Sequence, residues 1–195
     1  MIAIVILAAG ASRRLGRAKQ MEELGGETLL ERAVRVAAAS ELGEVLAVVR
    51  ADDAAVVAEA RRLPCRVVLN HEAGEGMAAS IRAGVRAAET PGGDGPTTAV
   101  LVMTCDQPAV TSTHLRELAA TAGDNVVASR YAGRRGVPAL FPARVFGELL
   151  ELRGDAGARE MLREAPAIEL RNGGVDIDTP AELDGARALF GGEPV

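Results

Sequence analysis

Short apolar runs recur along the chain and are separated by segments with a different periodicity. Each run is rich in Val, Ile and Leu, and apolar residues follow one another without polar alternation. Continuous runs of this kind are typical of strands that are buried on both faces of a parallel sheet. The pattern predicts strands over residues 2–7, 45–49, 66–69, 98–103 and 126–128.

Amphipathic helical spacing fills the segments between these runs. Residues 28–40 begin with a capping box, Thr28-x-x-Glu31, and then place leucine, alanine and valine on one face. Strands that alternate with helices form βαβ units, so we expect a three-layer α/β fold with a mostly parallel sheet. The same spacing predicts helices over residues 54–62 and 77–89, and Thr179 with Pro180 predicts the start of a last helix.

Length and composition favour one enzyme-sized domain over residues 1–195. The Gly- and Pro-rich stretch at 90–98 lies between a predicted helix and a predicted strand, so we interpret it as a loop. No apolar run is long enough for a membrane span, and Cys65 and Cys105 lack disulfide or metal-ligand spacing, which favours a cytoplasmic location. A net charge of −5 and the absence of Trp argue against nucleic-acid binding.

The first loop changes this acidic picture locally. Residues 6–19 read ILAAGASRRLGRAK, an apolar strand followed by small residues and four bases. A glycine turn at the carboxyl end of a strand lets backbone N–H groups approach an anion, while Arg14 and Lys19 supply charge. The loop lacks both the Walker A pattern and the Gly-x-Gly-x-x-Gly pattern. The alternative is a surface turn whose bases are merely solvated.

The stretch LAAGASRRLGRAK resembles the Leu-Ala-Ala-Gly-x-Ser-x-Arg signature of the MobA-like nucleotidyltransferases, and most closely that of the molybdenum cofactor cytidylyltransferases. Further stretches agree with the family in the same order and extend the resemblance over nearly the whole chain. They are GEGMAASIRAGV (74–85), VMTCDQPAVT (102–111), GVPALF (136–141), GDAGAR (154–159) and DIDTPAEL (176–183).

The resemblance implies a Rossmann-like fold and transfer of a nucleoside monophosphate from an NTP, with Mg²⁺ and release of pyrophosphate. It implies that the first loop holds the triphosphate and that Arg14 and Lys19 are catalytic, steadying the charge that grows on the phosphates. It also implies that the nucleobase is read near the second motif. The implied nucleotide-binding residues are Leu7, Ala8, Ala9, Gly10, Ala11, Ser12, Arg13, Asn70, Gly76 and Ser80.

Two aspartates are candidate metal ligands. Asp106 ends a buried strand at the same sheet edge as the first loop, and a triphosphate with its metal needs a hard oxygen ligand there. The alternative is that Asp106 only caps the turn before the helix that follows Thr111. Asp178 is a second candidate, although it directly precedes the helix cap and could simply order that loop. We interpret Asp176 as structural.

Other chemistry-bearing residues carry less weight. Cys105 lies next to Asp106, but a buried cysteine at a strand end is common in protein cores. His71 and His114 have no partners at ligand spacing, which indicates surface or capping histidines. The GDAGAR stretch could cap a helix at Asp155, whereas the resemblance places this loop near the second substrate.

Two residues bear on which nucleotide supplies the monophosphate and which molecule accepts it. Ala9 replaces the Gly of guanylyl-transferring relatives, which favours CTP over GTP, and the resemblance implies a phosphorylated, molybdopterin-type acceptor. Val137 stands where many cytidylyl members have His, which puts the acceptor in doubt. The alternatives are a guanylyl- or sugar-phosphate nucleotidyltransferase and a non-catalytic, nucleotide-binding cofactor-delivery protein. A molybdoenzyme or its chaperone is the candidate protein partner.

Overall fold

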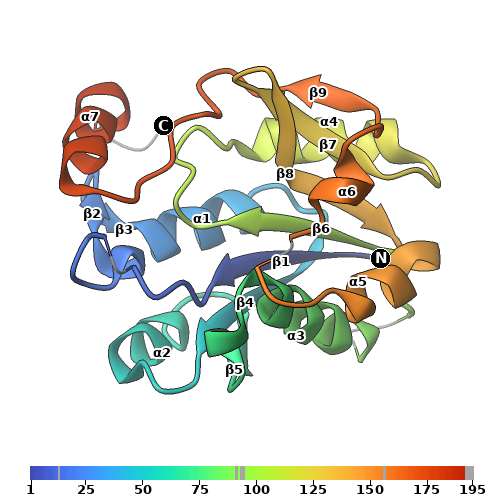
Figure 1. Ribbon diagram of the computed structural model, residues 1–195, viewed down its shortest axis with the longest axis horizontal. Helices are drawn as coiled ribbons and strands as arrows, with labels where there is room; N and C mark the ends of the chain where they lie inside the picture. The colour runs from blue at the N-terminus through green and yellow to red at the C-terminus, as the bar shows by residue number, and fades with distance from the viewer. Residues whose placement is uncertain (13, 91, 93–94, 156, 192–195) are drawn as a thin grey trace.

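The centre of the computed structural model, which describes residues 1–12, 14–90, 92, 95–155 and 157–191, is a seven-stranded sheet. Its strands are β1 (Ile2–Ala8), β4 (Gly43–Arg50), β5 (Arg66–Asn70), β6 (Ala99–Thr104), β7 (Val127–Tyr131), β8 (Arg134–Pro142) and β9 (Ala167–Glu169). They are ordered β5-β4-β1-β6-β8-β7-β9 (Figure 1). Within this sheet only β8 runs against the other strands, so the predicted, mostly parallel α/β fold is confirmed.

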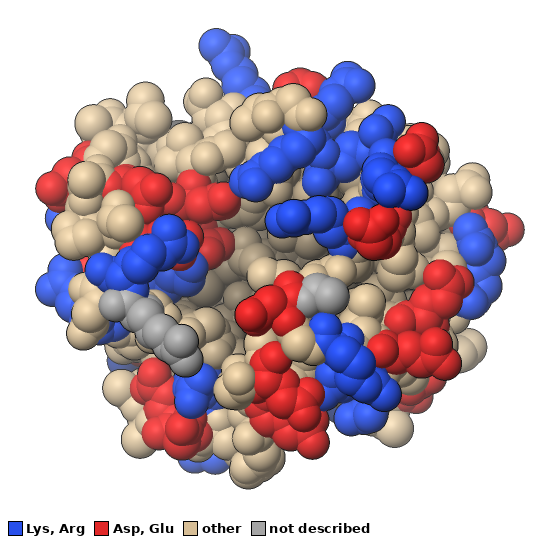
Figure 2. Space-filling view, in the orientation of Figure 1, with Lys and Arg blue, Asp and Glu red and all other residues tan. Residues whose placement is uncertain are grey.

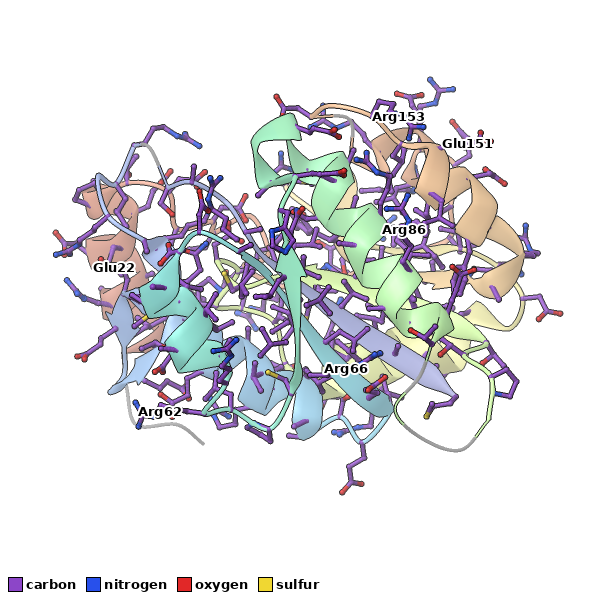
Figure 3. All side chains as sticks on the ribbon, turned by 90° about the horizontal axis from the view of Figure 1, so that it is seen from below. Glu22, Arg62, Arg66, Arg86, Glu151 and Arg153 are labelled. Atoms are coloured by element: carbon purple, nitrogen blue, oxygen red, sulfur yellow. The ribbon has the colours of Figure 1, made fainter. Side chains whose placement is uncertain are left out.

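Helices cover both faces of the sheet because the side chains of a strand alternate between them. Ile4 and Ile6 pack with helices α1 (Leu29–Ala38), α2 (Ala54–Ala60) and α4 (Ser112–Ala122). Ala3 and Val5 face the other way, toward α3 (Met77–Glu89), α5 (Phe146–Glu151) and α6 (Arg159–Leu162). Figure 3 shows α2 and α3 on opposite sides of the sheet edge. Both faces of β1 are therefore buried, as its continuous apolar run predicts.

Side-chain caps fix where several helices begin. The Thr28 hydroxyl accepts a hydrogen bond from the Glu31 amide at 3.0 Å, as the capping box predicts. Thr179 accepts in the same way from the Glu182 amide at 3.3 Å and starts α7 (Pro180–Phe190). These caps satisfy amide groups that the helix itself leaves unpaired.

A small apolar cluster holds α7 at the carboxyl edge of the sheet. Leu183 and Ile177 pack with Leu24 of a two-stranded hairpin formed by β2 (Glu23–Leu24) and β3 (Glu27–Thr28). In Figure 1 this hairpin and α7 lie together at the left of the molecule, where β1 ends. None of the helices in the described ranges is long and apolar enough to cross a membrane.

Candidate active site

A cavity of about 410 Å³ opens where β1 and β6 end. Its walls come from the loop after β1, the short 3₁₀ helix η1 (Lys19–Met21), the residues after β6, and the turn that contains η2 (Ala73–Glu75) before α3. The face drawn in Figure 2 is hollowed near its middle, and acidic and basic side chains both gather on the rim. In open α/β sheets ligands bind beyond the carboxyl ends of the strands, so this is the candidate site.

Lys19 lies at the electrostatic centre of this edge. Its ammonium group donates to the Asp106 carboxylate and, at 2.7 Å, to the Asp178 carboxylate. Arg14 donates to the other oxygen of Asp178 at 2.5 Å. Only 12% of the Lys19 side chain is exposed, compared with 68% for Arg14, so Lys19 is much the better shielded from solvent. The structure thus brings together the two basic residues predicted to be catalytic, Arg14 and Lys19, and the two predicted metal ligands, Asp106 and Asp178.

The protonation states in this cluster follow from its charges. Burial alone would lower the pKa of Lys19, but the carboxylates of Asp106 and Asp178 more than offset it, and the pKa lies above its ordinary value. Partial burial would raise the pKa of Asp178, but hydrogen bonds and charge from Lys19 and Arg14 hold it below its ordinary value. Lys19 is therefore a cation and Asp178 an anion near neutral pH.

The loop before α7 places Asp178 beside Asp106. The Ile177 amide donates to the Asp106 carbonyl at 3.0 Å, which ties this loop to the end of β6. The Asp178 amide donates to the Glu182 carboxylate at 3.0 Å, and the Thr179 hydroxyl accepts from the Glu182 amide, so both contacts tie this loop to the first turn of α7. The backbone of Asp178 thus orders the loop, while its carboxylate is left to contact Lys19.

Asp106 and Asp178 fit a hard divalent cation that brings further ligands of its own. Both carboxylates reach the same Lys19 nitrogen, so they face one small space. Mg²⁺ is commonly held by one or two carboxylates together with substrate phosphates and water. Over the described part of the chain, no group of three or more His, Cys, Asp and Glu side chains is arranged to hold a metal. Phosphate oxygens of a nucleotide would complete the coordination.

At the other end of the cavity, Ser80 and Gly76 form the wall near the start of α3. Ser80 is fixed by the Asn70 amide group, which donates to its hydroxyl oxygen at 3.0 Å. The Asn70 carbonyl oxygen accepts from the Glu72 amide at 2.9 Å, so this side chain is fully engaged. Asn70 itself borders a smaller neighbouring cavity, and it acts on the main cavity through Ser80.

A second cavity, of about 440 Å³, adjoins the first and shares Met77 and Asp155 with it. Three arginines line it, and the reversed direction of β8 explains two of them. The amino end of an antiparallel strand lies at the carboxyl edge of its neighbours, and Arg134 and Arg135 begin β8. Arg159, at the start of α6, is the third. Residues of the GDAGAR loop therefore border both cavities, and the placement of this loop near a second substrate, which the resemblance implies, stays a prediction.

The structure distributes the remaining predicted loop residues unevenly. Ala8 is buried, and its carbonyl oxygen accepts from Gln20 instead of facing the cavity. The Ser12 hydroxyl accepts from the Lys19 amide at 3.0 Å and so braces the loop. Arg13 lies outside the described residues. The predicted residues that line the main cavity are Leu7, Ala9, Gly10, Ala11, Lys19, Gly76, Ser80 and Asp106.

Several cavity residues are absent from the prediction. Arg50 follows the apolar run at 45–49 directly, so the same-edge argument that identifies Asp106 could have found it. Gln20 borders the main cavity but carries no sequence signal of its own, and Asp155, which the sequence offers as a helix cap, borders this cavity as well. Met77 is 47% exposed and lines both cavities.

Cys105 and His114 have clear structural environments. Burial raises the pKa of the Cys105 thiol to about 12, so it is protonated at neutral pH and is not a ready nucleophile. The expectation of a surface or capping role is wrong for His114, whose ring is 95% buried and lies 2.7 Å from the Ser129 hydroxyl. His71 is exposed, as expected.

A Rossmann-like sheet with a basic loop after β1, an aspartate pair at its carboxyl edge and two adjoining cavities defines a nucleotidyltransferase-like protein. The family model described as the MobA-like NTP transferase domain matches residues 4–169. The chain therefore belongs to the MobA-like NTP transferase family, as the motifs predict.

Curated relatives of similar length carry different names. The purine catabolism protein PucB of Bacillus subtilis is 33% identical, and the alignment covers 94% of each chain. The nicotine blue oxidoreductase of Paenarthrobacter nicotinovorans is also 33% identical, with 92% of this chain and 93% of the relative covered. A probable molybdenum cofactor guanylyltransferase of Opitutus terrae is 30% identical over 86% of this chain and 79% of its own.

Solved structures agree on the fold. A nucleotidyl transferase from Methanothermobacter thermautotroptrophicus superposes with a TM-score of 0.82 at 26% identity, covering 97% of each chain. A manganese complex of Rv0371C from Mycobacterium tuberculosis gives 0.75 at 26% identity, covering 96% of this chain and 98% of that one. The second of these structures contains a divalent metal, the class of ion that the aspartate pair fits.

Proposed function

We propose that this protein transfers CMP from CTP to the phosphate of a molybdopterin-type acceptor and releases pyrophosphate. The observation that carries the proposal is the cluster of Lys19, Asp106 and Asp178 beside the glycine loop. A divalent metal can replace the Lys19 ammonium group between the two carboxylates, and the ammonium group can contact phosphate oxygens instead. Both exchanges need only side-chain movement. Family membership supports the reaction class, and the motif of the first loop favours the cytidylyl branch.

The donor nucleotide would occupy the main cavity. Its triphosphate would lie against the loop at residues 9–11 with Lys19 and Arg14 as counter-charges, and its base would lie toward Ser80. Asp106 and Asp178 would hold Mg²⁺, which neutralises phosphate charge and orients the α-phosphorus when bound. The chain's own contribution is to position the reactants and to present positive charge where negative charge develops.

The acceptor would occupy the second cavity. Arg134, Arg135 and Arg159 suit an anionic ligand, and Val137 and Met77 give the wall an apolar part that suits a flat heterocycle. An oxygen of the acceptor phosphate attacks the α-phosphorus of CTP, and the bond from that phosphorus to the bridging oxygen breaks. Pyrophosphate leaves with the bonding electron pair, so no protein nucleophile is needed.

The test is pyrophosphate release by the purified protein with each of the four NTPs, in the presence of molybdopterin-type or sugar-phosphate acceptors. We expect release with CTP and the molybdopterin-type acceptor, and its loss in Asp106→Asn. Pyrophosphate release only with a sugar phosphate would contradict the proposed molybdopterin-type acceptor. Tight nucleotide binding without release for any pair would indicate a nucleotide-binding delivery protein instead.

Ala9 is the residue that we expect to favour CTP. It is 5% exposed and lines the main cavity, so its methyl group fills space beside the bound nucleotide. Ala9→Gly should narrow the ratio of kcat/KM for CTP over GTP by ~10-fold or more, within the range for one steric difference. Ala11→Gly removes a methyl group from the same loop and should leave the ratio closer to wild type. A wild-type preference for GTP would contradict the cytidylyl assignment.

A further inference from the structure

Gln20 is a buried polar side chain to which the proposed reaction assigns no role. It is 2% exposed, follows Lys19 in η1, and borders the main cavity. Its amide nitrogen donates to the Ala8 carbonyl at 2.7 Å and to the Gly10 carbonyl at 3.0 Å. Its amide oxygen is buried and has no partner among the described residues. A buried acceptor without a partner is unfavourable, so stability alone does not explain glutamine at this position.

The two accepted hydrogen bonds fix the direction of two peptide groups. In a trans peptide the N–H of a residue points away from the carbonyl of the residue before it. Because the Ala8 and Gly10 carbonyls point to Gln20, the amides of Ala9 and Ala11 point the opposite way. Both residues line the main cavity. Within the described part of the chain, the Ala11 amide donates no hydrogen bond.

The 3₁₀ helix η1, which contains Gln20, also fixes the first loop at a third point, Ser12. The Lys19 amide donates to the Ser12 hydroxyl at 3.0 Å, so residues 19 and 20 contact acceptors at positions 8, 10 and 12 of the loop. Backbone N–H groups held on one side of a loop form a concave site for an anion.

Building on the proposed function, we propose that Gln20 is a positioning residue that turns the amides of Ala9 and Ala11 toward the phosphates of the donor nucleotide. It acts through the backbone of the first loop and does not contact the reacting atoms. Its ligand chemistry is that of the polyphosphate, whichever base the nucleotide carries. Without the two hydrogen bonds, the carbonyls of Ala8 and Gly10 can rotate, and a carbonyl oxygen that faces a phosphate repels it.

The experiment measures binding of inorganic tripolyphosphate and of cytidine separately, by isothermal titration calorimetry. Gln20→Met keeps the length and burial of the side chain but removes both donors. We expect its affinity for tripolyphosphate to fall by about tenfold or more, as for the loss of two hydrogen bonds, with cytidine affinity unchanged. Gln107→Met is the matched control, because Gln107 is also buried and its amide donates to Tyr131 and to the Gly173 carbonyl.

Each outcome is decisive. Equal tripolyphosphate affinity in wild type and Gln20→Met, or an equal loss in Gln107→Met, overturns the role of Gln20 and leaves the proposed function standing. No binding of tripolyphosphate to the wild type overturns the proposed function itself. If Gln20→Met does not fold, amide NMR of the wild type decides. The Ala11 amide resonance should move on addition of tripolyphosphate, and an unmoved resonance contradicts the proposal.

Discussion

At the scale of single residues, the ammonium group of Lys19 links carboxylates from two distant parts of the chain. Asp106 ends β6 and Asp178 precedes α7, yet both reach the same nitrogen. Removing either carboxylate leaves the other paired with Lys19, so we expect the fold to survive single changes. Either substitution would, however, remove one of the two carboxylates that face the same space. The effects of substitution should therefore appear in metal use before they appear in stability.

Asp106→Asn should keep the fold and lose most turnover. The exchange is nearly isosteric but removes the charge of a proposed metal ligand, and a loss of ~10²-fold or more is expected by analogy with other charge-stabilising groups. The measurement is kcat at limiting and at saturating Mg²⁺, with thermal unfolding as the check on folding. Asp124→Asn, at an exposed position outside both cavities, is the control. Near-normal turnover of Asp106→Asn at limiting Mg²⁺ would remove Asp106 from the metal site.

At the scale of elements, the start of α3 is where two loops meet. Gly76 has φ +113°, and a Cβ placed there would lie 2.7 Å from the Gly154 carbonyl oxygen. The Ala78 amide donates to that same carbonyl at 3.1 Å, so the GDAGAR loop rests on the first turn of α3. This junction lies between the main cavity and the second cavity.

Gly76→Ala should displace this junction, because the left-handed backbone and the backbone contact both exclude a side chain. We expect a loss of ~1–3 kcal/mol in the free energy of unfolding and higher KM values for both substrates. Denaturant unfolding and steady-state kinetics measure the two effects. Gly147→Ala in α5 has open space around the added methyl group and should be neutral or slightly stabilising. Equal behaviour of the two variants would show that the junction tolerates a side chain.

His114 joins α4 to the strands behind it. Ser129 donates to the Pro138 carbonyl at 2.6 Å, so its oxygen accepts from the His114 ring N–H at 2.7 Å. Burial lowers the pKa of His114, and Glu117 opposes this only in part. The unfolded chain therefore takes up a proton below pH ~6.5 that the folded protein resists, and stability falls as the pH drops through that range.

Replacing His114 with Gln should remove this part of the pH dependence. We expect the difference in unfolding free energy between pH 7 and pH 5 to be smaller in His114→Gln than in the wild type. His71→Gln, at an exposed position, should retain the wild-type difference. Urea unfolding at a series of pH values provides the comparison. An unchanged slope in His114→Gln would show that this ring titrates alike in both states.

The sequence predicts elements whose signal is local and misses those that depend on neighbours. Apolar runs give β1, β4, β5, β6 and β7 to within a few residues, because each of these strands contains a continuous apolar run. Strand β8 is missed because it begins with two arginines and contains Gly136 and Pro138, which are typical of a loop. Strand β9, which pairs with β7 at the edge of the sheet, has three residues and no periodicity. Missing β8 is why Arg134 and Arg135 could not be placed in the second cavity.

The candidate site divides in the same way. Gly10, Lys19 and Asp106 follow predicted strands or belong to a recognisable motif, so the sequence alone brings them to one edge. The contact of Asp178 with Lys19 depends on the Ile177 amide binding the end of β6, a long-range hydrogen bond that no local pattern encodes. Gln20 is similar, since its importance lies in which carbonyls it reaches.

At the scale of the whole molecule, strand order separates the two cavities and also joins them. The main cavity, proposed for the donor, lies beyond β1 and β6, whereas the second cavity, proposed for the acceptor, lies beyond β8, next to β6 in the sheet. Because β8 alone is reversed within this sheet, its first residues and the last residues of β6 share one edge. If the two cavities hold the donor and the acceptor as proposed, the acceptor phosphate and the α-phosphorus would meet near Met77 and Asp155, which line both cavities.

The position of Lys19 between Asp106 and Asp178 sets the order in which ligands can bind. If Asp106 and Asp178 hold a divalent cation as proposed, the cation and the Lys19 ammonium group would compete for the same two carboxylates, and a bound triphosphate would attract the ammonium group away. Lys19→Met should bind Mn²⁺ ~10-fold more tightly than the wild type without nucleotide, whereas Lys19→Arg should not. Calorimetric titration with and without a non-hydrolysable CTP analogue measures this, and equal Mn²⁺ affinity of wild type and Lys19→Met would contradict it.

Thermodynamic reciprocity extends this competition to the nucleotide. If nucleotide raises the affinity for the cation, the cation raises the affinity for nucleotide by the same factor. Free enzyme would then remain without metal even where Mg²⁺ is abundant, and the two ligands would enter as one complex. Uptake of the cation would then depend on the nucleotide supply, and in the free protein Lys19 and Arg14 together would balance the charge of the two carboxylates.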